Sequence, residues 1–194
     1  MPGYRKIDNP EHRAFVAGVW GVDPDTLPGA GKSAYEMIES LGQDGGIHAL
    51  LVMASNLAVS APRVLHVQER LRSLDFLCVS DIFLSETAQM ADVVLPIAQW
   101  AEEGGTMTNL EGRVLHRRQA VPRPEGVSTD AAIVSALAAR LGAGRYFPTD
   151  DPAAIFEELR RASAGGPADY SGITYERIDR ENGVFWPCRI GLPL

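Results

Sequence analysis

Residues 47–96 form the stretch that decides the fold, IHALLVMASNLAVSAPRVLHVQERLRSLDFLCVSDIFLSETAQMADVVLP. This stretch contains three short apolar blocks, at residues 47–53, 76–79 and 93–95. Each block is too short and too continuously apolar for an amphipathic helix, which keeps polar residues on one side. Short continuous apolar runs are typical of strands that are buried on both faces. We therefore predict three buried strands.

Helical patterns fill both gaps between the predicted strands. In residues 61–73, Val64, Val67 and Leu71 alternate with Arg, Gln and Glu, and residues 84–91 also suit a helix. Strands that alternate with helices at this spacing form parallel sheets through right-handed crossovers. The predicted fold class is therefore α/β, a parallel sheet with helices beside it.

The remaining sequence predicts a three-part organisation. Residues 1–46 contain two predicted helices, at 10–20 and 32–41, joined by Pro- and Gly-rich turns, and form a helical lead-in that packs on the core. Residues 47–163 form the α/β domain, which continues through a strand at 114–121 and helices at 130–141 and 151–162. Residues 164–194 have no periodic pattern and many Gly, Pro and aromatic residues, which predicts an irregular extension.

Charge and hydropathy exclude several functional classes. The formal net charge of −7 disfavours binding to nucleic acid, whose phosphates repel an acidic protein. The longest apolar runs are far shorter than the roughly 20 residues that cross a bilayer. The opening residues also lack the apolar segment of a signal peptide. We expect a cytoplasmic protein that binds neither nucleic acid nor a membrane.

Polar residues follow each predicted strand. In open parallel sheets, ligands bind beyond the carboxyl ends of the strands. Those ends lead to Asn56, to Ser80 and Asp81, and to a loop that contains Glu103. Amide and carboxylate groups suit the base edge or ribose of a nucleotide, and a carboxylate can accept both adjacent N–H groups of guanine. The alternative is that these residues are ordinary turn formers and helix caps.

Other nucleotide-binding signals are weak. The sequence has no GxGxxG after a strand and no GxxxxGKS/T, and residues 29–33 (GAGKS) indicate a helix entry. Ser85, Glu86 and Thr87 are candidates to meet a phosphate near a helix amino terminus, or are simple caps.

Side chains that could hold a metal or perform catalysis are scattered. Cys78 and Cys188 belong to no CxxC pair, and the four histidines have no metal-site spacing, so we expect structural roles for all of them. We expect Glu102 and Glu103 to form a solvated acidic loop rather than a general acid and base. The basic residues between 113 and 118 suit a solvated strand face, or a contact with a phosphate or another domain.

Two consecutive blocks carry a family resemblance. The first is DIFLSETAQMADVVLP at residues 81–96, and the second is WAEEGGTMTNLEGR at residues 100–113. Both resemble the signature of molybdopterin guanine dinucleotide oxidoreductases, such as nitrate reductases and formate dehydrogenases. Residues 53–60 (MASNLAVS) resemble the Asn-Pro loop of that family, with Leu57 in place of the proline. Shorter matches near both ends extend the resemblance over nearly the whole chain and favour the assimilatory nitrate reductase type.

The resemblance implies an interior fragment of a larger catalytic subunit, chiefly its third, Rossmann-like domain. That domain holds part of a molybdopterin guanine dinucleotide whose molybdenum reduces nitrate to nitrite. By position in the motifs, Asn56, Ser80, Asp81 and Asp130 match residues that contact the cofactor, and Glu103 falls where some relatives carry a lysine. The iron–sulfur cluster of the parent enzyme would be bound by another domain. The fragment is then expected to be inactive alone, with the remaining domains and the cofactor as its partners.

Two other interpretations remain open. One is a fragment of a formate dehydrogenase, because the substrate pocket of this family depends largely on residues outside this chain. The other is a stand-alone binding or interaction module without cofactor. An interior fragment should expose apolar surface that its neighbours normally cover, and so should self-associate, whereas a stand-alone protein should not.

Overall fold

The computed structural model describes residues 1–191, which form two compact units. The first unit contains residues Met1–Ala30, Trp100–Val121 and the described residues from Ala131 onward. The second unit contains Gly31–Gln99 and Pro122–Asp130. The division of the chain into a lead-in, an α/β domain and an extension stays a prediction.

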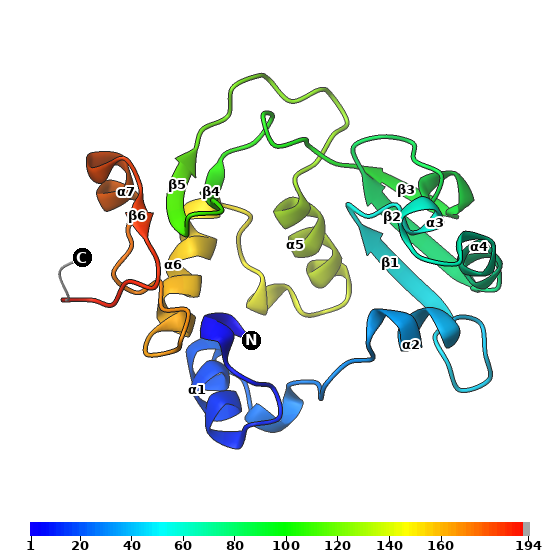
Figure 1. Ribbon diagram of the computed structural model, residues 1–194, viewed down its shortest axis with the longest axis horizontal. Helices are drawn as coiled ribbons and strands as arrows, with labels where there is room; N and C mark the ends of the chain where they lie inside the picture. Colours follow the sequence, from blue (N-terminus) through cyan, green and yellow to red (C-terminus); the bar gives the residue numbers. More distant parts are fainter. Residues whose placement is uncertain (192–194) are drawn as a thin grey trace. The chain divides into compact units, whose positions relative to one another are not determined.

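A three-stranded parallel sheet forms the centre of the second unit (Figure 1). Its strands are β1 (Ala49–Met53), β2 (Phe76–Asp81) and β3 (Val93–Pro96), in the spatial order β1-β2-β3. The register places Met53 beside Ser80, and Asp81 beside Pro96. The predicted parallel α/β fold is confirmed, and the carboxyl ends of the three strands share one edge of the sheet.

Three helices accompany this sheet: α2 (Ala34–Glu39), α3 (Leu57–Ser60) and α4 (Val64–Arg72). Ser33 caps α2 by accepting from the backbone N–H of Glu36, and the Glu36 carboxylate accepts from the backbone N–H of Ser33. This reciprocal pair is a capping box, which satisfies two N–H groups at the start of a helix. The prediction that the GAGKS segment is a helix entry is therefore confirmed.

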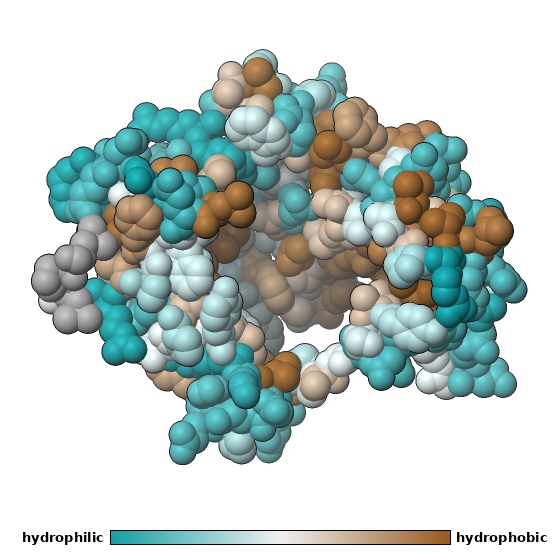
Figure 2. All heavy atoms as spheres, in the orientation of Figure 1, coloured by the Kyte–Doolittle hydropathy of each residue, from teal (hydrophilic) through white to brown (hydrophobic). Residues whose placement is uncertain are grey.

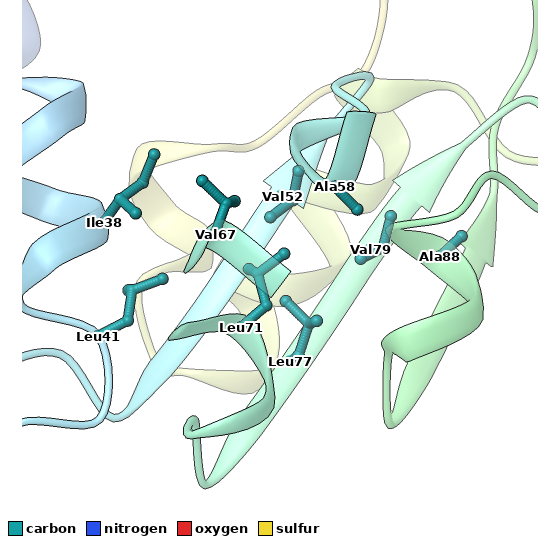
Figure 3. Close-up of a cluster of buried hydrophobic side chains, with 9 residues drawn as sticks. All are labelled: Ile38, Leu41, Val52, Ala58, Val67, Leu71, Leu77, Val79 and Ala88. Atoms are coloured by element: carbon teal, nitrogen blue, oxygen red, sulfur yellow. The ribbon is translucent and has the colours of Figure 1, made fainter. Parts of the chain in front are cut away.

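The core of the second unit lies between α4 and one face of the sheet (Figure 3). Val67 and Leu71 of α4 belong to the same buried cluster as Leu77 and Val79 of β2. On these strands alternate side chains point to opposite faces. The other face carries Leu51, Phe76 and Val93, which are 37%, 44% and 40% exposed.

The predicted helix at residues 84–91 is wrong, because only one 3-10 turn, η3 (Ala88–Met90), forms there. Side chains fasten this connection to the sheet instead. The Ser85 hydroxyl donates to the Asp81 carboxylate at 2.7 Å, and the Asp92 carboxylate accepts from the backbone N–H of Leu77 at 2.7 Å. Short polar side chains that bond to nearby groups compete with helix formation.

The first unit contains a small antiparallel sheet with helices packed around it. Its strands are β4 (Gly105–Thr108), β5 (Arg113–Arg117) and β6 (Val184–Phe185), in the order β4-β5-β6. The helices are α1 (Pro10–Trp20), α5 (Asp130–Arg140, whose first residue belongs to the second unit), α6 (Pro152–Ser163) and α7 (Tyr175–Glu181), with 3-10 turns η1 (Pro2–Tyr4), η2 (Pro24–Thr26) and η4 (Gly144–Tyr146). The core residues are Val114, Phe156, Ile173, Ile178, Val184 and Cys188.

Predictions for the first unit have mixed outcomes. The helices at 10–20, 130–141 and 151–162 are confirmed to within one residue at each end. The predicted strand at 114–121 ends earlier, at Arg117, and β4 forms in a segment that was predicted as a loop. The segment after α6 contains α7 and β6, which the aperiodic sequence did not predict.

Candidate functional site

The carboxyl ends of β1 and β2 bring Asn56, Ser80 and Asp81 to one edge of the sheet. Ser80 and Asp81 are the last residues of β2, and Asn56 lies three residues beyond the end of β1. The backbone N–H of Ala54 donates to the carbonyl of Ser80 at 2.8 Å, which continues the pairing past the strand end. These three residues therefore lie together at the carboxyl edge of the sheet, where the sequence predicted a ligand site.

Asn56 is held by two residues of the connection between β2 and β3. Its side-chain N–H₂ group donates to Glu86 Oε2 at 2.7 Å. Its Oδ1 accepts from the Thr87 hydroxyl at 2.8 Å and from the Thr87 backbone N–H at 3.2 Å. These bonds fix the orientation of the amide.

Asp81 is half-buried and keeps hydrogen-bonding capacity on both carboxylate oxygens. Oδ1 accepts from the backbone N–H of Ile82 at 2.8 Å, and Oδ2 accepts from the Ser85 hydroxyl at 2.7 Å. An ionised carboxylate offers about four acceptor positions. These two bonds, the ones made within residues 1–191, therefore leave room for a ligand that brings hydrogen-bond donors.

Ser80 places a polar atom in an apolar setting. Its side chain is fully buried, and Oγ has no hydrogen-bond partner among residues 1–191. Buried hydroxyl groups are normally paired, so an unpaired one needs an explanation. A hydroxyl group without a partner among the described residues thus directly precedes Asp81 in the sequence.

Asp130 approaches the same sheet through the third strand. The segment before it runs beside the end of β3, where the Ser128 backbone N–H donates to Pro96 at 3.1 Å and the Ala98 backbone N–H donates to Ser128 at 2.8 Å. Asp130 follows two residues later as the first residue of α5. A carboxylate in the first turn of a helix is also favoured by the helix dipole.

Glu103 lies in the first unit, and its carboxylate accepts from the Arg117 guanidinium at 2.9 Å. The two side chains are 25% and 15% exposed, so this ion pair is largely shielded from solvent. Glu103 is therefore part of an ion pair rather than of a solvated acidic loop.

Comparison with known proteins shows the family to which the chain belongs. The sequence profile of the molybdopterin oxidoreductase family matches residues 25–140, more than half of the chain. The chain belongs to this family. The matched range contains all the strand-end residues described above.

Two curated members of the family are similar over nearly the whole chain. The assimilatory nitrate reductase catalytic subunit of Bacillus subtilis is 52% identical over 188 residues, which are 97% of this chain and 26% of that protein. The alpha subunit of a formate dehydrogenase from Methanocaldococcus jannaschii is 43% identical over the same shares. The chain thus spans about a quarter of the length of these molybdopterin oxidoreductases.

A solved structure of the same fold supports the architecture. Acetylene hydratase from Pelobacter acetylenicus superposes with a TM-score of 0.64 at 21% identity, over 92% of this chain and 23% of that protein. This likeness concerns the fold alone.

The histidine side chains of this chain contact other protein groups. Among the described residues, no three His, Cys, Asp or Glu side chains form a group that could hold a metal ion. The histidines have protein partners: the backbone N–H of Lys6 for His12, Asp75 for His48, Glu39 for His66 and Asp179 for His116. Burial raises the pKa of the Cys78 thiol, which favours its protonated form.

The basic residues on and beside β5 are paired with carboxylates of the first unit. Arg117 pairs with Glu103, while His116 and Arg118 both bond to Asp179 at 2.9 and 3.2 Å. These carboxylates offset the positive charge of the strand.

No helix within residues 1–191 has the length and apolar character needed to cross a membrane.

Sequence reasoning did not anticipate the contacts that surround Asn56 and Asp81. Ser85, Glu86 and Thr87 were considered as phosphate contacts or caps. They bond to Asp81 and Asn56, and Thr87 also caps α3 by accepting from the backbone N–H of Ala58. The spacing of Asp81 and Ser85 is a local signal that could have indicated their bond. Asn56 and Thr87 are 31 residues apart, and no sequence pattern links them.

Proposed function

We propose that this chain helps to bind the guanine dinucleotide part of a molybdopterin cofactor within a larger cytoplasmic oxidoreductase of the nitrate reductase type. The observation that carries the proposal is the Asp81 carboxylate, which keeps acceptor capacity at the carboxyl edge of a parallel sheet. Ligands of such sheets bind at this edge. Alone, the chain would be inactive, because the rest of the enzyme would complete the cofactor site.

The polar groups at the sheet edge fit a guanine nucleotide. Asp81 can accept the two adjacent N–H groups of the base, and the free N–H of Asn56 can donate to an acceptor atom. Ser80 Oγ, which is unpaired within the described residues, adds polar capacity beside them. Asp130 lies two residues beyond Ser128, whose backbone pairs with Pro96 at the end of β3. When bound, the cofactor supplies the redox chemistry through its molybdenum, while these residues bind and orient its nucleotide.

Glu103 contributes to this proposal only through the family resemblance. A carboxylate repels phosphate, whereas the lysine of some relatives attracts it. The ion pair with Arg117 offsets the charge of Glu103. We therefore propose that Glu103 acts on the cofactor together with Arg117, as a neutral pair.

Nitrate is the proposed substrate of the whole enzyme, because identity to the nitrate reductase subunit, at 52%, exceeds the 43% to the formate dehydrogenase subunit. Formate is the second candidate, since that relative matches the same share of the chain. Assays of nitrate reduction and formate oxidation on the protein that contains this chain would separate the two. Formate oxidation without nitrate reduction would reverse the order of the candidates.

Titration calorimetry with GDP and ADP tests the proposed binding role. Weak binding that favours GDP is expected, because other parts of the enzyme complete the pocket. Asp81→Ala should weaken GDP binding about tenfold or more, the usual loss for a hydrogen-bonded charged group. Asp75→Ala is the matched control, because Asp75 precedes β2 at the opposite edge of the sheet and is 79% exposed. Binding that is equal for GDP and ADP, or unaffected by Asp81→Ala, would contradict the proposal.

A further inference from the structure

Two neighbouring side chains leave Asn56 with a single type of free hydrogen-bonding group. Both lone pairs of Oδ1 are used by the hydroxyl and the backbone N–H of Thr87. One of the two side-chain N–H hydrogens is used by Glu86. An asparagine amide has two donors and two acceptor positions. The remaining capacity is therefore one N–H donor.

Thr87 also performs the capping task that would otherwise fall to Asn56. Asn56 is the N-cap residue of α3, yet its side chain makes no capping bond. Asparagine at this position normally accepts from a backbone N–H of the first turn. Here the Thr87 hydroxyl accepts from the backbone N–H of Ala58 at 3.0 Å. An asparagine that served only the helix would cap it, so the geometry points to another use for the Asn56 amide.

We propose that Glu86 and Thr87 are positioning residues, which hold the Asn56 amide so that one N–H is presented to an acceptor atom of the bound nucleotide. This inference rests on the proposed function and concerns how Asn56 is oriented before the nucleotide binds. We call Glu86 and Thr87 together the clamp of Asn56. Thr87 is fully buried and holds the amide oxygen. Glu86 is exposed and holds one N–H of the amide, because its carboxylate accepts hydrogen bonds but donates none.

The cavity beside Glu86 contains one other charged side chain. Glu86 lines a cavity of about 510 Å³ together with Gln68, Arg72 of α4 and Gln89. Arg72 is the other charged residue in that lining. The hydrogen bond from Asn56 is the main reason that the pKa of Glu86 lies below its ordinary value. Glu86 therefore stays ionised, and available as an acceptor, at neutral pH.

The clamp can be observed in the free protein by nitrogen-15 NMR of the Asn56 side-chain amide. The amide proton bonded to the carboxylate should lie downfield, which widens the separation that the two protons of any asparagine amide show. Glu86→Ala should move that proton upfield, and Glu86→Gln should largely restore its shift, since the glutamine carbonyl can accept the same bond. Gln89→Ala is the matched control, because it alters the same cavity without touching Asn56. An Asn56 amide unaffected by Glu86→Ala would overturn the clamp.

GDP titrations then test whether the clamp matters for binding. Loss of one neutral hydrogen bond predicts that Asn56→Ala weakens GDP binding about 2- to 10-fold. Glu86→Ala should weaken it by a similar factor, Glu86→Gln should restore it, and the double variant with Asn56→Ala should show no further loss.

The outcomes separate this inference from the proposed function. If unaltered protein binds GDP and Glu86→Ala binds it equally well, the positioning role is wrong and the proposed function stands. If Asn56→Ala binds GDP as the unaltered protein does, the positioning role is also wrong. If the unaltered protein fails to bind GDP, the proposed function fails, and the inference that rests on it fails with it.

Discussion

At the residue scale, Asp169 is a buried carboxylate that organises the segment after α6. The residue is 1% exposed, and its carboxylate accepts from the backbone N–H groups of Gly165 at 2.7 Å and Ser171 at 2.8 Å. Burial alone would raise its pKa, but the hydrogen bonds from Ser171 and Gly165, with a smaller contribution from Arg189, outweigh burial and lower the pKa below its ordinary value. Asp169 is thus stabilising in its ionised form.

This lowered pKa predicts how stability depends on pH. The stabilisation is fully present above the pKa of the unfolded chain, about 3.9, and is lost as the pH falls through the lower pKa of the folded state. Asp169→Asn should therefore lower the free energy of unfolding at pH 7 by about 1–3 kcal/mol and flatten its fall in acid. Urea unfolding between neutral and acidic pH measures both effects. The exposed Asp150→Asn is the control, and an acid dependence unchanged in Asp169→Asn would contradict this account.

Residues of the candidate site differ in how far sequence could locate them. Asn56 and Asp81 were found because the ends of apolar blocks mark the edge of a parallel sheet. The bond between Asn56 and Thr87 could not be found, because it depends on the path of the chain between β2 and β3. The bond between Asp81 and Ser85 is local, and their spacing could have indicated it. The burial of Ser80 likewise follows from packing and not from its sequence position.

At the element scale, α6 begins at a cap made by one side chain. Asp151 accepts from the backbone N–H groups of Ala153 and Ala154 at 3.3 and 3.2 Å, and Pro152 occupies the first helical position. Asp151→Ala should lower the free energy of unfolding by about 1 kcal/mol, because two N–H groups lose their partner. Thermal unfolding measures the change, with Asp150→Ala as the adjacent control. Equal effects of both substitutions would show that charge, and not capping, is responsible.

A substitution at Leu77 tests the assigned core between α4 and the sheet. This residue is 2% exposed within the buried cluster of the second unit, so Leu77→Ala should lower the free energy of unfolding by about 2–5 kcal/mol. Leu65→Ala on α4 is the matched control, because Leu65 is 81% exposed and should change stability by no more than about 0.5 kcal/mol. Urea unfolding that finds the two variants equally stable would contradict the assigned core.

Elements with strong local signals were predicted from the sequence. α1 begins with Pro10 after the capping residue Asn9 and ends at Trp20, where Gly21 follows in a left-handed conformation. The parallel strands followed from continuous apolar runs. β4 and α7 were missed because they pack against other parts of the first unit, and tertiary contacts override weak local propensity.

At the scale of the whole molecule, the chain carries exposed apolar residues that bear on its state in solution. Ile82, Phe83 and Leu84 follow β2 and are 46%, 75% and 66% exposed. Apolar side chains also reach the surface over the region of α3 and α4 (Figure 2). Such surface suits contact with another protein segment. It agrees with a chain that spans about a quarter of its relatives, 26% of the B. subtilis subunit.

Self-association is the expected consequence. Sedimentation velocity should show a mass that increases with concentration, and the double substitution Phe83→Ser and Leu84→Ser should reduce this increase. Leu110→Ser is the control, because Leu110 is exposed in the other unit. A monomer at all concentrations would favour a stand-alone protein over a part of a larger enzyme.

The central claim is that the carboxyl edge of the parallel sheet holds a guanine nucleotide. The most direct test is a backbone NMR titration of the labelled chain with GDP, which maps the residues that respond. We predict that the largest shifts occur at residues 54–57 and 80–87, with smaller ones near Asp130 and none at Asp75. Unchanged signals at the carboxyl edge in millimolar GDP, from a protein that remains folded, would contradict the account.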